Sequence, residues 1–402
     1  MRHRYLARHA RVMGVLALCA VSATFMVAPS LALASTTTTL TPTTTPLPTT
    51  TSVTMAAINL ACASKAVSSW TLTQLANETI VVSLNVANVG AMVPAAKAGF
   101  GGLLLFGASA PVNMATTIAR VQARTLHPYP MLVMTDEEGG GVQRLTNVIG
   151  SIPWASTMGK NLTPQRIMGV GARIGSALLN AGVNVDLAPV LDVDARHVAP
   201  GRADPDGYRS FSGSATVVAQ DATAFMRGLA AANVTSVVKH FPGLGGASQN
   251  TDYGPAATRP WAQLKKIGLV PFEVAINAGA SAVMLSNASV PGLTSMPASL
   301  SPAVVQELRQ SLGFRGLIMT DSLSAGAVGA LHLTPPAAAV KALQAGVNMI
   351  LAGGPQSPVS SLSLAQSIAS AVVSAVNNGA LSLATLQLDA AQVLATRNVI
   401  AC

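Results

Sequence analysis

Charged and aromatic residues are both scarce in this chain. Only 10% of its 402 residues are charged and 4% are aromatic, whereas 50% are hydrophobic. Such a composition excludes an intrinsically disordered chain and is sufficient for a large buried core. No cluster of lysine and arginine interleaved with aromatic residues occurs, so no nucleic-acid partner is expected.

Cysteine is nearly absent, and so are the common cofactor motifs. The three cysteines form no CxxC pattern and no cluster with histidine, which excludes the usual structural metal sites. Neither GxGxxG nor GxxxxGK[ST] occurs, so no nucleotide cofactor is expected. Cys62 and Cys402 lie at the two ends of the expected folded region, and in an oxidising compartment we expect them to form a disulfide.

The N-terminus has the order of a secretory signal peptide. Four arginines in the first 11 residues precede the apolar run VMGVLALCAVSATFMVA, and Ala32-Leu33-Ala34 supplies a small-residue cleavage site. We therefore expect residues 1–34 to be removed and the protein to be secreted or held at the cell envelope. An uncleaved membrane anchor is the alternative, because the run is about as long as a short transmembrane helix.

A Thr/Pro-rich segment follows the signal sequence. Residues 35–54 read STTTTLTPTTTPLPTTTSVT, a composition that favours an extended linker and cannot build a core. We expect a linker over 35–65 and one folded domain over 66–402. Without residues 1–34 the chain has 20 basic and 15 acidic residues, a net charge of +5 that suits an anionic cell wall.

Short apolar runs alternate with Ala-rich segments of helical periodicity from about residue 66 onward. The runs are GGLLLFG (101–107), PMLVMTD (130–136), VNVDLAPVLD (183–192), TSVVKH (235–240), SAVMLSN (281–287), GLIMTD (316–321) and VNMILAG (347–353). Apolar strands alternating with helices predict a parallel sheet covered on both faces. Seven or eight such units predict an α/β fold, a single (β/α)₈ TIM-type barrel, with a doubly wound open sheet as the alternative.

Polar residues end these strands one after another. They are Asp136, Asp192, Lys239, His240, Asn287 and Asp321. Active sites of (β/α)₈ barrels lie at the carboxyl ends of the strands, so this placement predicts an enzyme. With no metal or cofactor motif, a pair of carboxylates is the natural catalytic apparatus, as in glycoside hydrolysis.

Asp321 is the best candidate nucleophile, because it ends an apolar strand and small residues follow it in GLIMTDSLSAG. The alternative is a helix-capping aspartate. Asp136 opens DEEGGGVQR and is placed to accept hydrogen bonds from sugar hydroxyls. Alternatively, Glu137, Glu138 and Arg144 of the same segment form a structural ion-pair network.

The segment KHFPGLGG places Lys239 and His240 before a Gly-rich loop. Strand alternation predicts that one of them points into the barrel mouth and the other towards the wall. Arg209, in DGYRSF, is a candidate for binding hydroxyls or an acidic group. Its alternative role is a salt bridge to Asp204 or Asp206.

Together these segments resemble glycoside hydrolase family 3. The shared motifs are KHFPG, D-x-EGG-x-VQR, N-x-D-x-APVLDV, the R-S-F loop and the strand end TDSLSA, which span nearly all of residues 66–400. The branch that looks most similar is that of the bacterial β-N-acetylhexosaminidases of the NagZ type. The resemblance implies a (β/α)₈ barrel that releases terminal β-linked N-acetylglucosamine with retention, often from peptidoglycan fragments.

The resemblance also implies roles for individual residues. Asp321 falls on the nucleophile that forms a covalent glycosyl-enzyme, and Arg144 falls on a supporting arginine. The residues that fall on positions holding the terminal N-acetylglucosamine are Asp136, Arg209, Lys239 and His240.

The chain departs from this family branch in the loop after Lys239-His240. Leu244 replaces a histidine, and Asn250-Thr251-Asp252 replaces the Asp-Ser-His that supplies the general acid/base. Gly141 also replaces an arginine. We expect Asp252 to transfer the proton itself once burial over the sugar raises its pKa. A catalytically impaired glycan-binding barrel, a β-glucosidase and a glycoside phosphorylase of the same family are the alternatives.

Overall fold

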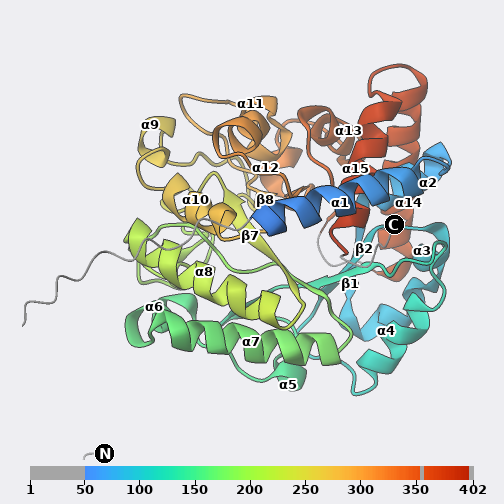
Figure 1. The fold of residues 1–402 in the computed structure, drawn as a ribbon. Coiled ribbons are helices and arrows are strands. Elements are labelled where there is room, and N and C mark those ends of the chain that lie inside the picture. Colours follow the sequence, from blue (N-terminus) through green and yellow to red (C-terminus); the bar gives the residue numbers. More distant parts are fainter. Residues whose placement is uncertain (1–49, 354–356, 398–402) are drawn as a thin grey trace, which may run out of the picture. The chain divides into compact units, whose positions relative to one another are not determined.

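The computed structural model describes residues 50–353 and 357–397, shown as coloured ribbon in Figure 1. The expected signal peptide over 1–34, most of the Thr/Pro-rich segment and Cys402 lie outside the described residues. Signal cleavage and the pairing of Cys62 with Cys402 therefore stay predictions.

Eight parallel strands form one sheet in the order β10-β1-β2-β3-β6-β7-β8-β9. Their bounds are β1 (Ile80–Asn85), β2 (Gly102–Phe106), β3 (Leu132–Thr135), β6 (Val185–Asp186), β7 (Thr235–Phe241), β8 (Ala282–Leu285), β9 (Leu317–Thr320) and β10 (Ile350–Leu351). A parallel bridge pairs Met319 with Met349, and the backbone N–H of Thr320 donates to the Met349 carbonyl at 3.0 Å. These contacts join β9 to the start of β10 and close the sheet, which confirms the predicted barrel.

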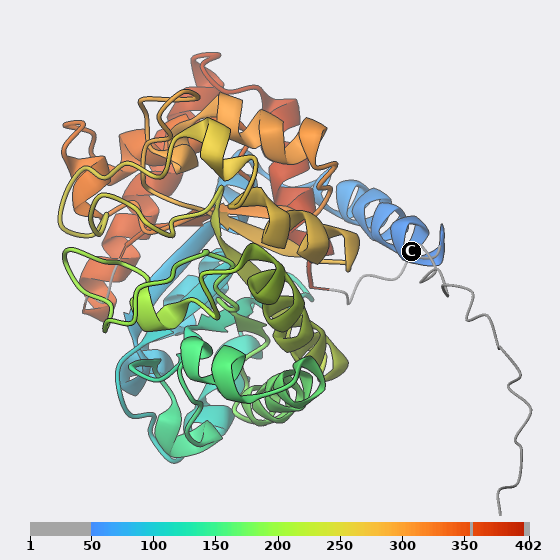
Figure 2. The same ribbon diagram turned by 90° about the vertical axis from the view of Figure 1, so that its left-hand side faces the viewer.

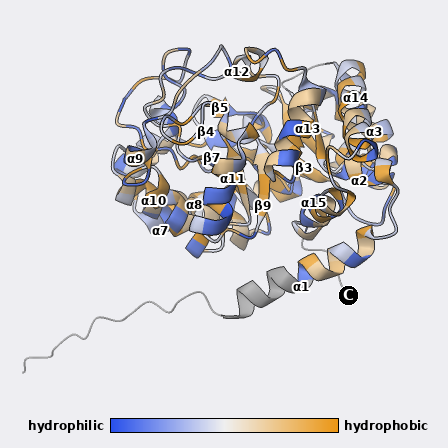
Figure 3. Cartoon of the chain, turned by 90° about the horizontal axis from the view of Figure 1, so that it is seen from above, coloured by the Kyte–Doolittle hydropathy of each residue, from blue (hydrophilic) through white to orange (hydrophobic). Residues whose placement is uncertain are grey.

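The strands are apolar throughout because they are buried on both sides. In β1, Ile80, Val82 and Leu84 belong to the core between strands and helices, whereas Val81 belongs to a separate apolar cluster. Alternate residues of the other strands join Val81 in that second cluster, which fills the barrel interior. Figure 3 shows the strands as largely apolar and hydrophilic residues on helices such as α7 and α8.

Helices surround the strands, as the two views in Figures 1 and 2 show. The longer ones are α1 (Thr50–Val67), α4 (Met114–Gln122), α7 (Pro164–Asn180), α8 (Ala215–Ala231), α10 (Leu269–Asn277), α13 (Pro335–Ala345), α14 (Pro358–Asn377) and α15 (Leu383–Ala395). The shorter ones are α2 (Leu72–Glu78), α3 (Val93–Ala98), α5 (Thr146–Ile149), α6 (Ala155–Asn161), α9 (Trp261–Leu264), α11 (Pro302–Gln306) and α12 (Gly326–Gly329). A two-stranded hairpin of β4 (Glu137–Gly139) and β5 (Val142–Gln143) follows β3.

Within the part of the chain that the structure describes, one helix, α14, is long and apolar enough to span a membrane by length and composition alone. It packs against α13, α2 and β1, and its Ala365, Ile368 and Val372 are buried in the core. These contacts identify α14 as one of the helices that cover the barrel.

The start of the folded part differs from the sequence prediction. Helix α1 begins at Thr50, inside the segment 35–65 that was expected to be an extended linker. The residues after Thr54 read MAAINLACASKAV and are mostly good helix formers. Ala63 and Val67 are buried, and α1 packs along α15, so tertiary contacts stabilise this helix.

Candidate active site

The carboxyl ends of the strands open into a cavity of about 510 Å³. All the residues that the sequence identified as site candidates line it: Asp136, Arg144, Arg209, Lys239, His240, Asp252 and Asp321. They follow β3, β5 and β9, lie in β7, or belong to the loops before α8 and after β7. Closure of the barrel thus brings together side chains that are far apart in the chain.

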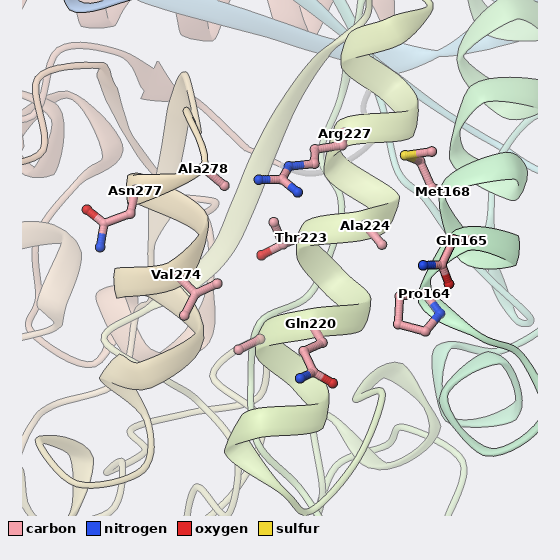
Figure 4. Close-up of a pocket in the computed structure, with 11 residues that line it drawn as sticks. Pro164, Gln165, Met168, Gln220, Thr223, Ala224, Arg227, Val274, Asn277 and Ala278 are labelled. Carbon is pink, nitrogen blue, oxygen red and sulfur yellow. The ribbon is translucent and has the colours of Figure 1, made fainter. Parts of the chain in front are cut away.

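A second hollow, of about 560 Å³, lies on the outside of the barrel between α7, α8 and α10. Figure 4 shows the side chains that line it, including Gln165, Gln220, Thr223 and Arg227. Its lining residues include no carboxylate and no histidine. Of these two hollows, only the cavity at the strand ends is lined by groups suited to acid–base chemistry.

Two cations and two carboxylates form a buried ion-pair network at one side of that cavity. The Lys239 Nζ lies 2.7 Å from both Asp136 Oδ1 and Glu138 Oε1. Arg209 binds Glu138 with two hydrogen bonds, at 2.7 Å from Nε and 2.9 Å from Nη2. Burial alone would raise the pKa of Glu138, but Arg209 and Lys239 hold it well below its usual range. Glu138 is therefore a permanent anion that holds both cations.

These contacts revise the alternative role considered for Arg209. Its ion-pair partner is Glu138, and neither Asp204 nor Asp206 takes that place. Asp204 pairs instead with Arg196 at 2.8 Å. The sequence singled out Glu138 only as part of a structural network, although its place two residues after the strand-end Asp136 was the available signal.

Lys239 and His240 both line the cavity, which corrects the expectation that strand alternation would turn one of them away. The reason lies in the pairing of β7 with β8. Val238 pairs with Val283 and Phe241 pairs with Leu285, so the register shifts between them. Regular alternation therefore does not hold across Lys239 and His240, and both side chains reach the same cavity.

His240 is held at both ring nitrogens. Its Nδ1 lies 2.6 Å from Asp192 Oδ2, and its Nε2 lies 3.3 Å from Arg209 Nη2. Burial and the positive charge of Arg209 lower the pKa of His240 to about 4. The ring is therefore neutral near pH 7, with Nδ1–H donating to Asp192 and Nε2 accepting from Arg209.

Asp192, like Glu138, has a role in the site that the sequence did not predict. It is fully buried, and it accepts backbone hydrogen bonds from Leu244 at 2.6 Å and from His240 at 3.2 Å. Burial raises its pKa to about 6, so it is ionised at neutral pH. Asp192 thereby fixes both the His240 ring and the first turn of the loop that follows β7.

Asp192, Asp206 and His240 each place a ligand atom within 4.8 Å of the others, which makes them a candidate set of metal ligands. Two observations argue against a cation there. Arg209 already lies 3.3 Å from His240 Nε2 and would repel it. Burial and the charge of Asp192 raise the pKa of Asp206 far above its usual range, which disfavours the charged carboxylate that a cation would need.

The two candidate catalytic carboxyls line the same cavity from different segments. Asp321 is half-buried, its backbone N–H donates to Leu285 at 3.0 Å, and its Oδ1 accepts from Ser322 N–H at 2.6 Å. Burial raises the pKa of Asp321, and the negative charge of Asp252 raises it further. Asp252 itself is exposed, so a ligand above it is needed to supply the burial that the sequence interpretation assumed.

The loop after β7 has a small core of its own, which explains Leu244. Leu244 is buried and packs with Ala247, Ala256 and Ala288 in a separate apolar cluster. Leu244 also lines the strand-end cavity, where it presents an apolar side chain in place of a histidine ring. Leucine suits the cluster, and it leaves Asp252 as the titratable side chain at the tip of the loop.

Comparisons with known proteins agree with this geometry. Residues 76–396 match the family described as "Glycosyl hydrolase family 3 N terminal domain". An uncharacterized secreted glycosyl hydrolase from Arthroderma benhamiae is 31% identical over 309 residues, which are 74% of this chain and 84% of that protein. The β-hexosaminidase LpqI of Mycobacterium tuberculosis is 36% identical over 236 residues. That match covers 56% of this chain and 58% of LpqI, so the chain spans a little over half of that relative's length.

Solved structures give the same result. The crystal structure of a β-N-acetylhexosaminidase from Beutenbergia cavernae superposes with a TM-score of 0.74 at 31% identity. The superposition covers 82% of this chain and 99% of the other. The barrel, the strand-end cavity and the relatives point to one family, as the motifs predicted.

Proposed function

The chain belongs to glycosyl hydrolase family 3, and on that premise we propose that it removes terminal β-linked N-acetylglucosamine from glycans. It is a glycoside hydrolase, and relatives named β-hexosaminidase support N-acetylglucosamine as the sugar. We further propose that the enzyme is exported and that its substrates are peptidoglycan or related fragments. The basis for export is the signal sequence, and one relative is itself described as secreted.

One observation carries the proposal: Asp321 and Asp252 line a single cavity beside the buried group of Lys239, Asp136, Glu138 and Arg209. A retaining glycosidase needs a carboxylate nucleophile and a second group that moves a proton. Asp321 attacks the anomeric carbon, and Asp252 protonates the departing oxygen. In the second step Asp252 removes a proton from water, which attacks the same carbon and releases Asp321.

The remaining residues bind the sugar. Asp136 accepts hydrogen bonds from hydroxyls, whereas the Lys239 ammonium and the Arg209 guanidinium donate them. His240 is neutral and is held in place by Asp192, so that the edge of its ring contacts the sugar. Arg144, whose Nη2 lies 3.8 Å from Asp136 Oδ2, supports that carboxylate at the rim.

Nitrophenyl β-N-acetylglucosaminide and nitrophenyl β-glucoside, each with and without phosphate, test this function on purified protein lacking residues 1–34. We expect nitrophenol release from the first substrate, with N-acetylglucosamine as the product whether or not phosphate is present. A sugar phosphate as product would identify a phosphorylase, and preference for the glucoside would identify a β-glucosidase.

A second candidate function is that of a glycan-binding barrel with impaired catalysis. Two observations favour it: Asp252 is exposed, and no histidine stands at position 252. It predicts binding of N-acetylglucosamine without turnover. Calorimetric titration with the sugar, run beside the nitrophenol assay, separates the two.

A further inference from the structure

The loop that carries Asp252 is attached to the segment that follows Asp321. The backbone N–H of Gly326 donates to the Asp252 carbonyl at 3.1 Å, and the N–H of Ala327 donates to the Thr251 carbonyl at 2.9 Å. Gly326 and Ala327 open helix α12, which begins five residues after Asp321. The two candidate catalytic carboxyls are thus joined through a short path of main-chain contacts.

The backbone of Gly326 lies so close to this loop that there is no room for a side chain. A Cβ atom on Gly326 would lie 2.8 Å from Gly254 N, 2.8 Å from the carbonyl carbon of Tyr253 and 2.9 Å from Asp252 O. All three neighbours are backbone atoms, so no side-chain rotation relieves the clash. An added methyl group must move either α12 or the loop.

The loop is the side that would move. Ala327 and Val328 of α12 are buried, and the backbone N–H of Leu323, just before the helix, donates to the Leu351 carbonyl of β10 at 3.0 Å. In contrast, Asp252 and Tyr253 are exposed, and only Thr251 and Gly254 on either side of them are buried. Asp321 has its own anchor on Leu285 and would keep its position.

We propose that Gly326 is a positioning residue that sets the place of Asp252 relative to Asp321. This inference rests on the proposed role of Asp252 as general acid/base. A general acid must lie within hydrogen-bond reach of the oxygen that it protonates. A misplacement of about 1 Å can lower a rate about 10²-fold, so the close contact at Gly326 has a direct kinetic consequence.

The variants Gly326→Ala and Gly329→Ala form a matched pair that tests this. Both residues lie in α12 and gain one methyl group, but a Cβ on Gly329 meets no atom within 4 Å. We expect Gly326→Ala to lower kcat/KM by about tenfold or more on a glycoside with a poor leaving group, and much less on a dinitrophenyl glycoside. Gly329→Ala should leave both rates nearly unchanged, and both variants should melt close to the parent protein.

Hydrogen exchange supplies a readout that needs no activity. In Gly326→Ala the backbone amides of residues 326 and 327 should exchange faster than in Gly329→Ala, because their acceptors lie on the displaced loop. Unchanged exchange would overturn the inference, and so would equal rate loss on both substrates. If the parent protein hydrolyses no N-acetylglucosaminide but exchange still responds, the contact stands while its catalytic role and the proposed function both fail.

Discussion

Lys239 Nζ and Glu138 Oε1 lie 2.7 Å apart, and each side chain is only 3% exposed. Glu138 also holds Arg209, so one buried carboxylate orients both cations that we assign to sugar binding. Removing the charge of Glu138 would take an ion-pair partner from both Lys239 and Arg209. A buried cation with an uncompensated charge destabilises the folded state in a low-dielectric site.

Glu138→Gln should therefore lower the free energy of unfolding by about 3–5 kcal/mol and raise KM for N-acetylglucosaminides. Urea unfolding and steady-state kinetics measure the two effects. Glu137→Gln is the neighbouring control when unfolding is measured at pH 5, because burial raises the pKa of Glu137 to about 7 and its side chain is mostly uncharged at that pH. Equal stability loss in the two variants would contradict the role given to Glu138.

Asp321→Asn should reduce turnover by several orders of magnitude, because the amide cannot attack the anomeric carbon. Folding and sugar binding should remain, since the anchor on Leu285 uses the backbone of residue 321. Calorimetric titration with N-acetylglucosamine and a thermal melt check both points. A variant with near-normal turnover would place the nucleophile elsewhere.

Asp252→Ala should slow the hydrolysis of poor leaving groups far more than that of activated aryl glycosides, which need little protonation to depart. Added azide should restore part of the deglycosylation rate, because an anionic nucleophile needs no base. Equal loss on both substrate classes without azide rescue would remove Asp252 from the acid/base role.

Asp389→Asn should stabilise the protein at alkaline pH. Burial raises the pKa of Asp389 from 3.8 to about 7, although Asn348 donates to its Oδ1 at 2.8 Å. The folded-state pKa lies above the unfolded value, so the parent loses stability as pH rises from about 4 through 7. The free energy of unfolding of the variant should exceed that of the parent by a few kcal/mol at pH 8, with about 4 kcal/mol as the upper bound. At pH 4 the two proteins should be equally stable. Urea unfolding at the two pH values measures the difference, and an equal effect at both would contradict the assignment.

Cys62 and Cys402 should be joined by a disulfide in protein taken from the envelope or medium. A bridge that closes so long a loop stabilises by about 6 kcal/mol in the chain-entropy model, before native strain is subtracted. Mass spectrometry of the unreduced protein tests the pairing, and two alkylated thiols would refute it.

Much of the fold follows from local pattern. Apolar runs such as GLIMTD end in a polar residue and alternate with helical segments, and this periodicity alone predicts a barrel with Asp136 and Asp321 at one end. The run Ile80–Asn85, which forms β1, was not among the seven predicted strands. Helix α1 was not predicted, because its helix-forming residues directly follow the Thr/Pro-rich segment and were assigned with that segment to one linker.

The partners within the site depended on tertiary structure. Arg209 meets Glu138 across 71 residues, a pairing that no local pattern distinguishes from nearby Asp204 or Asp206. The register of β7 and β8 shifts across Lys239 and His240, where both side chains reach the cavity, and strand alternation alone does not predict this. The close approach of Gly326 to the Asp252 loop likewise exists only once the barrel has closed. Sequence periodicity determines which residues are buried and which strand ends are polar, but the contacts between distant segments depend on strand register and on the distance between two backbones.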